Sequence, residues 1–220
     1  MALTLVIGNR NYSSWSLRPW LAMKMADIAF DEIRIPLDQP DTKTNILRHS
    51  PTGKVPCLLD DSAAGRLTVW DSLAICEYVS EAYAGGRMWP ADRAARARAR
   101  SAAAEMHSGF APLRIHMSMD IRARKFERGA TAQAREDVAA DIARIRALWG
   151  EALATSNGPF LFGGFSVADA FFAPVVMRFV TYGVELAPPL AAYRERIVSL
   201  APMQEWITAA TAETEDLGDH

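Results

Sequence analysis

The first 84 residues alternate between strand-like and helix-like hydrophobic patterns. Leu3–Ile7 is a short apolar run closed by Gly8, which is typical of a buried strand. Apolar residues at positions 17, 20, 21 and 25 have helical spacing and predict a helix over 17–26. Pro19 falls in the first turn of that helix, where proline is tolerated. The alternating stretch 30–37 predicts a second strand.

Shorter elements continue the pattern as far as residue 84. A polar stretch at 38–50 has room for one helical turn. Two further strands and the loop between them are predicted at 57–59, 66–69 and 60–65. Apolar residues at 73, 75, 76 and 79 predict a helix over 71–84, with Asp71 or Ser72 as its cap. The predicted order is β-α-β-α-β-β-α, an α/β domain over residues 1–84.

Strand signals stop after the Gly- and Pro-rich stretch "YAGGRMWPADR", within which 85–92 is the predicted linker. Residues 93–220 are rich in Ala, Leu, Met and Arg and predict a second, all-helical domain. Its helices are predicted at 93–125, 131–155, 166–182 and 189–212. Ser166 and Asp169 have the spacing of a capping box, with Asp in place of the usual Glu.

Composition and charge narrow the class of protein. Half of the 220 residues are apolar, and 24 basic against 26 acidic side chains give a formal charge of −2. This composition is typical of a globular protein, and the charge gives no overall field for nucleic acid or an anionic membrane. We expect no membrane span, because no apolar run reaches about 20 residues. The first ten residues lack the basic start of a signal peptide.

The chain has two cysteines, Cys57 and Cys76, with neither a metal-ligand spacing nor a disulfide framework. We therefore expect no metal and a reducing, cytoplasmic location. Both thiols are expected to be buried and inert, because one follows a proline in a strand and the other faces the apolar side of a helix. A thiol–disulfide oxidoreductase would need a cysteine where this chain has serines, at the start of its first helix.

Ser13, Ser14 and Ser16 stand directly ahead of the first predicted helix. Two interpretations compete for them. Serine oxygens cap helices by accepting hydrogen bonds from the free N–H groups of the first turn. A hydroxyl at the same positive helix end can also hold an anion.

Two further features lie nearby in the predicted fold. Pro56 stands where a strand begins, and a cis Val55–Pro56 bond would turn the backbone of Val55 toward a ligand. At the start of another helix, Ser72 and the free N–H groups suit a carboxylate, while Asp71 suits an ammonium group. A ligand with a thiol, a carboxylate, an ammonium and a peptide-like middle fits all three features, and glutathione has these groups.

The set "SSWSLRPWLA", "SPTGKVPCL", "WDSLAICEYVSE", "MWPADRAARAR" and "GGFSVADAFFAP" resembles the cytosolic glutathione transferase superfamily. Each motif is weak alone, but the set in this order is specific and covers nearly the whole chain. The resemblance implies a thioredoxin-like N-terminal domain, an all-helical C-terminal domain and a homodimer. It also implies glutathione as co-substrate and an active site that faces a cleft between the domains.

Within that superfamily the pattern resembles the serine type of the zeta, tau and phi classes. In such members the catalytic serine lies five residues before the arginine of the first helix, which is Ser13 when counted from Arg18. Ser14 is the second candidate. Zeta-like members carry a cysteine where this chain has Trp15.

The resemblance also implies the glutathione-binding residues. Val55 and the adjoining Pro56 would meet the cysteinyl part through the backbone. Ser72 and Asp71 would hold the γ-glutamyl end, where many relatives have Glu in place of Asp71. Lys54 would lie near the glycyl carboxylate.

A serine hydroxyl and a helix end suffice to activate a thiol. A free thiol has a pKa of about 8.5, so only about 3% is thiolate at pH 7. Lowering that pKa by about two units takes roughly 2.7 kcal/mol. A hydrogen bond to a charged group supplies about 1.5–3 kcal/mol and a helix N-terminus roughly 0.3–2 kcal/mol.

The second substrate is expected to be a small electrophile. Met106, Phe110 and Arg114 are spaced by four and would share the face of a long helix opposite Ser13. Arg114 or Arg178 would suit an acidic substrate. Zeta-like isomerases usually carry a pocket arginine at the position that counting assigns to Thr181, a departure from their pattern. That departure counts against an isomerase. A glutathione-dependent isomerase and a non-catalytic glutathione-binding module are still the two alternatives.

Overall fold

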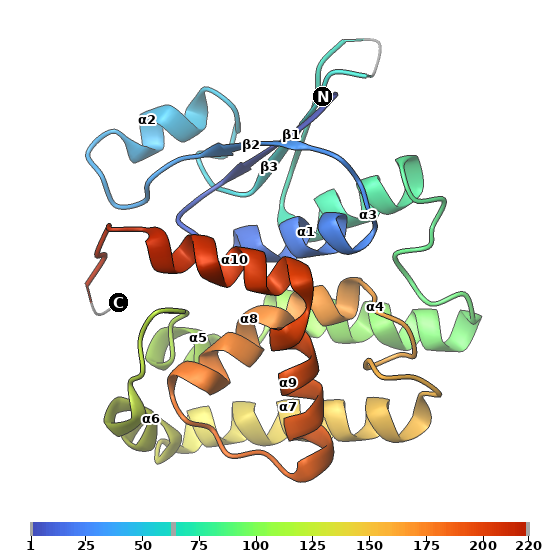
Figure 1. The fold of residues 1–220 in the computed structure, drawn as a ribbon, viewed down its shortest axis with the longest axis vertical. Coiled ribbons are helices and arrows are strands. Elements are labelled where there is room, and N and C mark those ends of the chain that lie inside the picture. Colours follow the sequence, from blue (N-terminus) through green and yellow to red (C-terminus); the bar gives the residue numbers. More distant parts are fainter. Residues whose placement is uncertain (1, 63–64, 219–220) are drawn as a thin grey trace.

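The computed structural model describes residues 2–62 and 65–218. Within them a four-stranded sheet with its helices is followed by an all-helical part (Figure 1). The strands are β1 (Leu3–Ile7), β2 (Asp31–Arg34), β3 (Cys57–Asp60) and β4 (Leu67–Trp70). This arrangement confirms the predicted fold class, and the change to helices alone falls between residues 82 and 93. The predicted loop 60–65 lies partly outside the described residues.

The sheet has the order β2-β1-β3-β4, with β1 parallel to β2 and antiparallel to β3. Helices α1 (Ser14–Met25) and α3 (Ser72–Ala82) pack together, and their apolar side chains join one large core with the residues of β1. A smaller apolar cluster joins the sheet to α2 (Thr42–Leu47) through Ile46. The N-termini of α1 and α3 are thereby held by buried apolar side chains.

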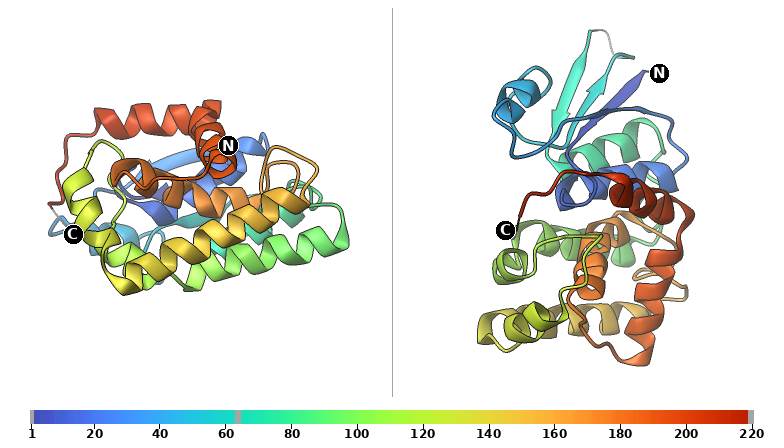
Figure 2. Two further views of the ribbon diagram at one scale, coloured as in Figure 1. Left: turned by 90° about the horizontal axis from the view of Figure 1, so that it is seen from below. Right: turned by 60° about the vertical axis from the view of Figure 1, so that its left-hand side comes forward.

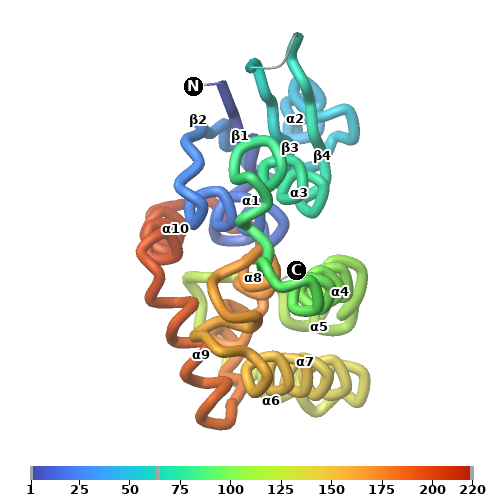
Figure 3. Tube along the Cα trace, turned by 90° about the vertical axis from the view of Figure 1, so that its right-hand side faces the viewer, coloured from blue at the N-terminus to red at the C-terminus, as the bar shows by residue number. Residues whose placement is uncertain are grey.

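The helical part is built around α8, whose residues are almost all buried. Figure 3 shows α8 below α1 and beside α4, and both helices contact it. The bounds are α4 (Arg93–Ser108), α5 (Ala111–His116), α6 (Phe126–Gln133), α7 (Glu136–Thr155), α8 (Val167–Thr181), α9 (Pro188–Ser199) and α10 (Ala201–Ala212). The packing of α8 and α10 on α1 joins the two parts of the chain.

Three of the predicted long helices are each divided in the structure. The helix expected over 93–125 is wrong beyond Ser108, because Phe110 adopts a left-handed conformation with a φ of 59°. A shorter helix then begins, and Pro112 lies in its first turn, where a missing N–H is harmless. The stretch 117–125 is not helical. The helix predicted over 131–155 is interrupted at 134–135, and the helix predicted over 189–212 is interrupted at Leu200.

The capping box and the burial of the cysteines are confirmed. Ser166 is the N-cap of α8, and the carboxylate of Asp169 accepts hydrogen bonds from its N–H at 2.9 Å and its hydroxyl at 3.0 Å. Cys57 and Cys76 are free and fully buried, and burial raises the pKa of both thiols. Both thiols are therefore protonated at neutral pH.

None of the helices at 2–62 and 65–218 is long and apolar enough to cross a membrane. Within the same residues no group of three or more His, Cys, Asp or Glu side chains is placed to hold a metal ion.

Candidate functional site

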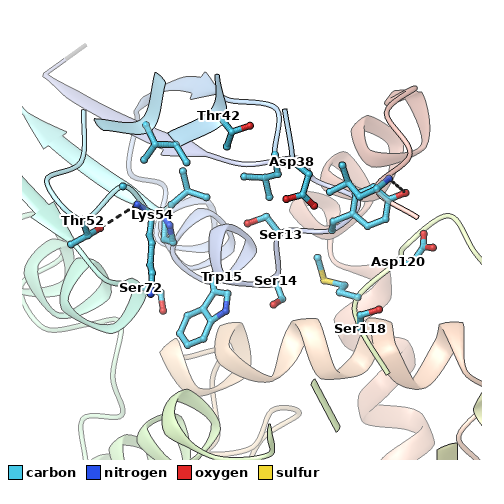
Figure 4. A pocket seen from close by; sticks show the side chains of 18 of the residues that line it. Ser13, Ser14, Trp15, Asp38, Thr42, Thr52, Lys54, Ser72, Ser118 and Asp120 are labelled. Carbon is cyan, nitrogen blue, oxygen red and sulfur yellow. Dashed lines mark hydrogen bonds between the residues drawn. The ribbon is translucent and has the colours of Figure 1, made fainter. Parts of the chain in front are cut away.

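A cavity of about 850 Å³ opens between the sheet domain and the helical part (Figure 4). Its walls bring together the residues that the sequence predicted for the thiol and for glutathione. These are Ser13, Ser14, Lys54, Val55, Pro56, Asp71 and Ser72. Figure 4 shows Lys54 and Ser72 on one side, Ser13 and Ser14 in the centre, and Ser118 and Asp120 on the opposite side.

Both serines at the start of α1 are buried, and their hydrogen bonds differ. Ser13 is the N-cap, and its Oγ accepts from the N–H of Ser16 at 3.4 Å, as the capping interpretation predicts. Its hydroxyl donates to Ser16 Oγ at 2.7 Å, which also accepts from the N–H of Gly8 at 3.1 Å. Ser14 Oγ instead accepts from Arg178 Nη2 of α8 at 3.2 Å. Ser14 is therefore tied to the helical domain and Ser13 to its own helix.

Trp15 occupies the position next to these serines and forms part of the wall. It is 36% exposed, and the guanidinium carbons of Arg18 and Arg114 lie 4.2 and 5.0 Å from its ring centroid. Arg18 is fully buried and also lies 4.8 Å from the ring of Phe171. Aromatic faces therefore stabilise a cation that is removed from water.

Asp71, one of the two caps that the sequence predicted, is the N-cap of α3. Its Oδ1 accepts from the N–H groups of Leu73 at 2.8 Å and Ala74 at 3.4 Å, and its φ of 74° is rare for a residue other than glycine. Such a conformation costs about 1–3 kcal/mol and is most often found at functional sites. The other oxygen, Oδ2, lies 3.3 Å from Nε2 of His107 on α4. Burial, together with the charges of Arg18 and Arg114, lowers the pKa of His107.

Ser72 is fully buried, and its hydroxyl has no hydrogen-bond partner among the described residues. A buried hydroxyl without a partner costs about 1–3 kcal/mol. Because Ser72 lines the cavity at the N-terminus of α3, a ligand carboxylate there would satisfy it.

The loop before β3 completes this side of the cavity. The Val55–Pro56 peptide bond is cis, and both residues line the cavity. Lys54 is exposed at the rim, and its backbone N–H donates to Thr52 Oγ1 at 3.3 Å.

The opposite side of the cavity was not predicted from the sequence. It is formed by Tyr12, Leu217 and the segment 118–125, which the sequence analysis assigned to a helix. The carboxamide of Asn11 holds this segment: Nδ2 donates to Asp120 Oδ1 at 2.8 Å and Oδ1 accepts from the N–H of Arg122 at 2.9 Å. Asn11 and this segment are more than a hundred positions apart in the sequence, so no local pattern could have predicted their contact.

The predicted substrate residues Met106, Phe110 and Arg114 are not among the residues that line this cavity. Met106 is fully buried, and Phe110 lies beyond the end of α4, so they do not share the face of one helix with Arg114. The guanidinium of Arg114 donates to the carbonyl oxygens of Met106 and Gly109. It therefore satisfies the free carbonyls at the C-terminus of α4.

The C-terminal segment 213–218 lies between the two domains and reaches the cavity at Leu217 (Figure 2, right). The carboxylate of Glu213 accepts from the N–H groups of Arg10 at 2.7 Å and Asn11 at 3.0 Å. Arg122 donates to the carbonyl oxygens of Glu213 and Glu215. The loop that leads into α1 is thus attached to the C-terminal segment.

The arrangement suits an elongated anionic ligand. Two helix N-termini point at one cavity, Ser72 offers an unused hydroxyl, and Lys54 adds a positive charge at the rim. A thiol placed between the two helices would lie against the serines of α1, where an anion is stabilised.

Comparison with known proteins points to one family. The sequence model of the glutathione S-transferase N-terminal domain matches residues 12–82, and that of the C-terminal domain matches residues 128–196. A probable maleylacetoacetate isomerase of Caenorhabditis elegans is 26% identical over 181 residues, which are 81% of this chain and 79% of that protein.

Solved structures agree in fold. The theta class glutathione S-transferase of Xanthomonas axonopodis pv. citri, solved with glutathione bound, is 26% identical, with a TM-score of 0.66 over 96% of this chain and 99% of that one. A glutathione transferase homologue from Burkholderia, also with bound glutathione, is 24% identical, with a TM-score of 0.70 over 96% and 98% of the two chains.

Proposed function

Because the chain belongs to the glutathione S-transferase superfamily, we propose that it activates the thiol of glutathione for attack on a small electrophile. The observation that carries this proposal is the single cavity lined by Ser13, Ser14, Val55, Asp71 and Ser72. These residues come from three separate stretches of the chain, and together they offer the groups that glutathione requires.

The proposed orientation places the γ-glutamyl end at the N-terminus of α3. Its carboxylate accepts from the hydroxyl and the backbone N–H of Ser72 at the start of α3, and its ammonium meets Oδ2 of Asp71, the oxygen that lies 3.3 Å from Nε2 of His107. The backbone of Val55 pairs with the cysteinyl unit, beside Pro56. The glycyl carboxylate lies near Lys54. The thiol then points toward α1.

In this proposal the thiol becomes the reactive thiolate without a general base. The thiol proton leaves to solvent, and a serine hydroxyl of α1 donates a hydrogen bond to the sulfur anion. A hydrogen bond to a charged group is worth about 1.5–3 kcal/mol, which lowers the pKa of the thiol by about one to two units. The serine keeps its own proton.

We assign the electrophile to the opposite side of the cavity. Tyr12, Met119 and Leu217 offer ring and apolar surface there. Asp120 and Lys125 form an ion pair of 3.1 Å at the same place. The mixture favours a small substrate with both an apolar and a polar part.

A glutathione-dependent isomerase is the second candidate, supported by the probable maleylacetoacetate isomerase of Caenorhabditis elegans. Against it stands Thr181, the position at which zeta-like members usually carry an arginine. Thr181 is buried, and its hydroxyl donates to the carbonyl oxygen of Asp120 at 2.8 Å. A non-catalytic glutathione-binding module is the third.

The test combines calorimetric titration with glutathione and turnover assays on electrophiles, isomerisable dicarboxylates and peroxides. We expect saturable binding and glutathione-dependent turnover of at least one electrophile. Binding without turnover on the whole panel would favour the module, and turnover of the isomerisable substrates alone would favour the isomerase. Absence of glutathione binding would reject the proposal.

A homodimer and a cytoplasmic location remain predictions from the family resemblance. The exposed side chain of Leu67 on edge strand β4 offers apolar surface for a second copy. Sedimentation of the purified protein tests the dimer.

A further inference from the structure

Arg178 is a buried cation that belongs to neither wall of the cavity. It lies in the last turn of α8, is 3% exposed and donates from Nη2 to Ser14 Oγ at 3.2 Å. Its Nε and Nη1 have no hydrogen-bond partner among the described residues. Burying a guanidinium that makes a hydrogen bond to only one serine lowers the stability of the fold. A function for the contact with Ser14 would explain why the buried charge is present.

Ser13 and Ser14 differ in whether their hydroxyl hydrogen is available to a ligand. The hydroxyl hydrogen of Ser13 is used in the 2.7 Å bond to Ser16 Oγ. At Ser14 the guanidinium of Arg178 occupies the oxygen, which leaves the hydroxyl hydrogen to donate into the cavity. A hydroxyl that accepts from a cation is also a stronger donor, because the two hydrogen bonds polarise each other.

We propose that Arg178 is a positioning residue that orients and polarises the hydroxyl of Ser14, and that Ser14 is the serine that donates to the thiolate of glutathione. This inference rests on the proposed function. The thiol proton leaves to solvent, and both Ser14 and Arg178 keep their protons. The positive charge stays two hydrogen bonds away from the sulfur, with Ser14 between them, and it favours the anion.

Arg178 is charged at neutral pH, and the neighbouring arginines do not compete with it for Ser14. Burial, followed by the charge of Arg114, lowers the pKa of Arg178 to about 9, so the guanidinium remains charged at neutral pH. Arg114 donates from Nε and Nη2 to backbone carbonyl oxygens at the end of α4. Arg18 lies against aromatic rings. Among the hydrogen bonds that these three arginines make within the described residues, only that of Arg178 reaches a serine of α1.

The experiment titrates the thiol of bound glutathione by the ultraviolet absorbance of its thiolate. We expect Ser14→Ala and Arg178→Met each to raise the pKa of the bound thiol by about one to two units. The pH profile of kcat/KM should move upward by the same amount and reach its plateau at higher pH. Arg178→Lys keeps the charge and should restore part of the shift.

Arg114→Met is the matched control, because it removes a neighbouring guanidinium charge but leaves the hydrogen bond between Arg178 and Ser14 in place. It should raise the pKa of the thiol less than Arg178→Met does. An equal rise would mean that the general field, and not the contact with Ser14, carries the effect, and would overturn the inference.

A double-mutant cycle provides the second test. If Arg178 acts through Ser14, Arg178→Lys changes the pKa of the thiol in the wild-type background but adds little to Ser14→Ala. Full additivity would overturn the positioning role. Because Arg178→Met removes a buried charge and can fail to fold, the cycle with Arg178→Lys decides the matter by itself.

The outcomes also separate this inference from the proposed function. A larger rise for Ser13→Ala than for Ser14→Ala would overturn the inference, while glutathione transfer by the wild type would still stand. Failure of the wild type to bind glutathione would remove both.

Discussion

At the scale of single residues, Ser72 and Ser80 form a natural pair for comparison. Both lie on α3, both are at most 1% exposed, and neither hydroxyl has a hydrogen-bond partner among the described residues. They differ in one respect, since Ser72 lines the cavity at the N-terminus of α3 and Ser80 does not. Comparing substitutions at the two serines therefore separates the effect of a buried, unpaired hydroxyl on stability from its effect on ligand binding.

We expect Ser72→Ala to weaken glutathione binding by roughly ten- to a hundredfold, because the ligand loses a hydrogen bond to its carboxylate. The free energy of unfolding of the ligand-free protein should not fall, since the hydroxyl has no partner to lose. Calorimetric titration and urea unfolding measure the two effects. Ser80→Ala is the control and should leave the affinity unchanged. Equal affinities for Ser72→Ala and wild type would contradict the assignment.

At the scale of elements, Asp60 joins the end of β3 to α3. It is fully buried and accepts from Tyr78 Oη at 2.5 Å, from Tyr83 Oη and from the N–H of Ser62 at 2.8 Å. Burial raises the pKa of this carboxyl, but the hydrogen bonds from Ser62, Tyr78 and Tyr83 outweigh it and hold the pKa well below its usual range. The charged form is thus part of the contact between sheet and helix.

Asp60→Asn should lower the free energy of unfolding by about 1–3 kcal/mol at neutral pH, because an amide cannot accept all of these hydrogen bonds. A depressed pKa contributes stability above the unfolded value of about 4 and loses it as pH falls below that value. The stability difference between wild type and variant should therefore shrink below about pH 4. Urea midpoints of both proteins across this range measure it, and a constant difference would contradict the linkage.

At the scale of the whole molecule, the C-terminal segment 213–218 holds the loop that leads into α1. Glu213 accepts from two backbone N–H groups of that loop and lies 3.4 Å from Arg34. Its side chain is 7% exposed. Residues about 200 positions apart in the chain are thus joined beside the cavity.

Glu213→Gln should reduce the free energy of unfolding by about 1–3 kcal/mol, because one of the two N–H groups then faces an amide N–H₂. Glu205→Gln on α10 is the control, since Glu205 is 54% exposed and pairs with Lys24 at 2.8 Å. An exposed pair is worth at most about 1 kcal/mol, so the control should change little. Thermal unfolding compares the two, and similar losses would contradict a special role for Glu213.

The sequence predicted the elements whose signals are local. Ser166 is an N-cap as expected, Asp71 is one of the two caps expected for α3, and Ser13 is a cap as one of the two interpretations of the serines predicted. A cap can be predicted because it involves N–H groups only two or three residues away. Helix α1 begins at Ser14, three residues before its predicted start. The helix predicted over 93–125 was wrong after residue 108, since a left-handed residue interrupts an otherwise helical composition. That error moved the expected substrate pocket to residues that do not line the cavity.

The sequence by itself determined the α/β and all-helical parts, the capping box of α8 and the identity of the glutathione-site candidates. Periodicity, capping and turn chemistry act over a few residues and can be read along the chain. Only the tertiary structure decided which serine meets Arg178, 164 positions away, and which segment forms the opposite wall of the cavity. Those contacts follow from the packing of α8 on α1, where buried side chains far apart in the chain select one another by shape and hydrogen bonding.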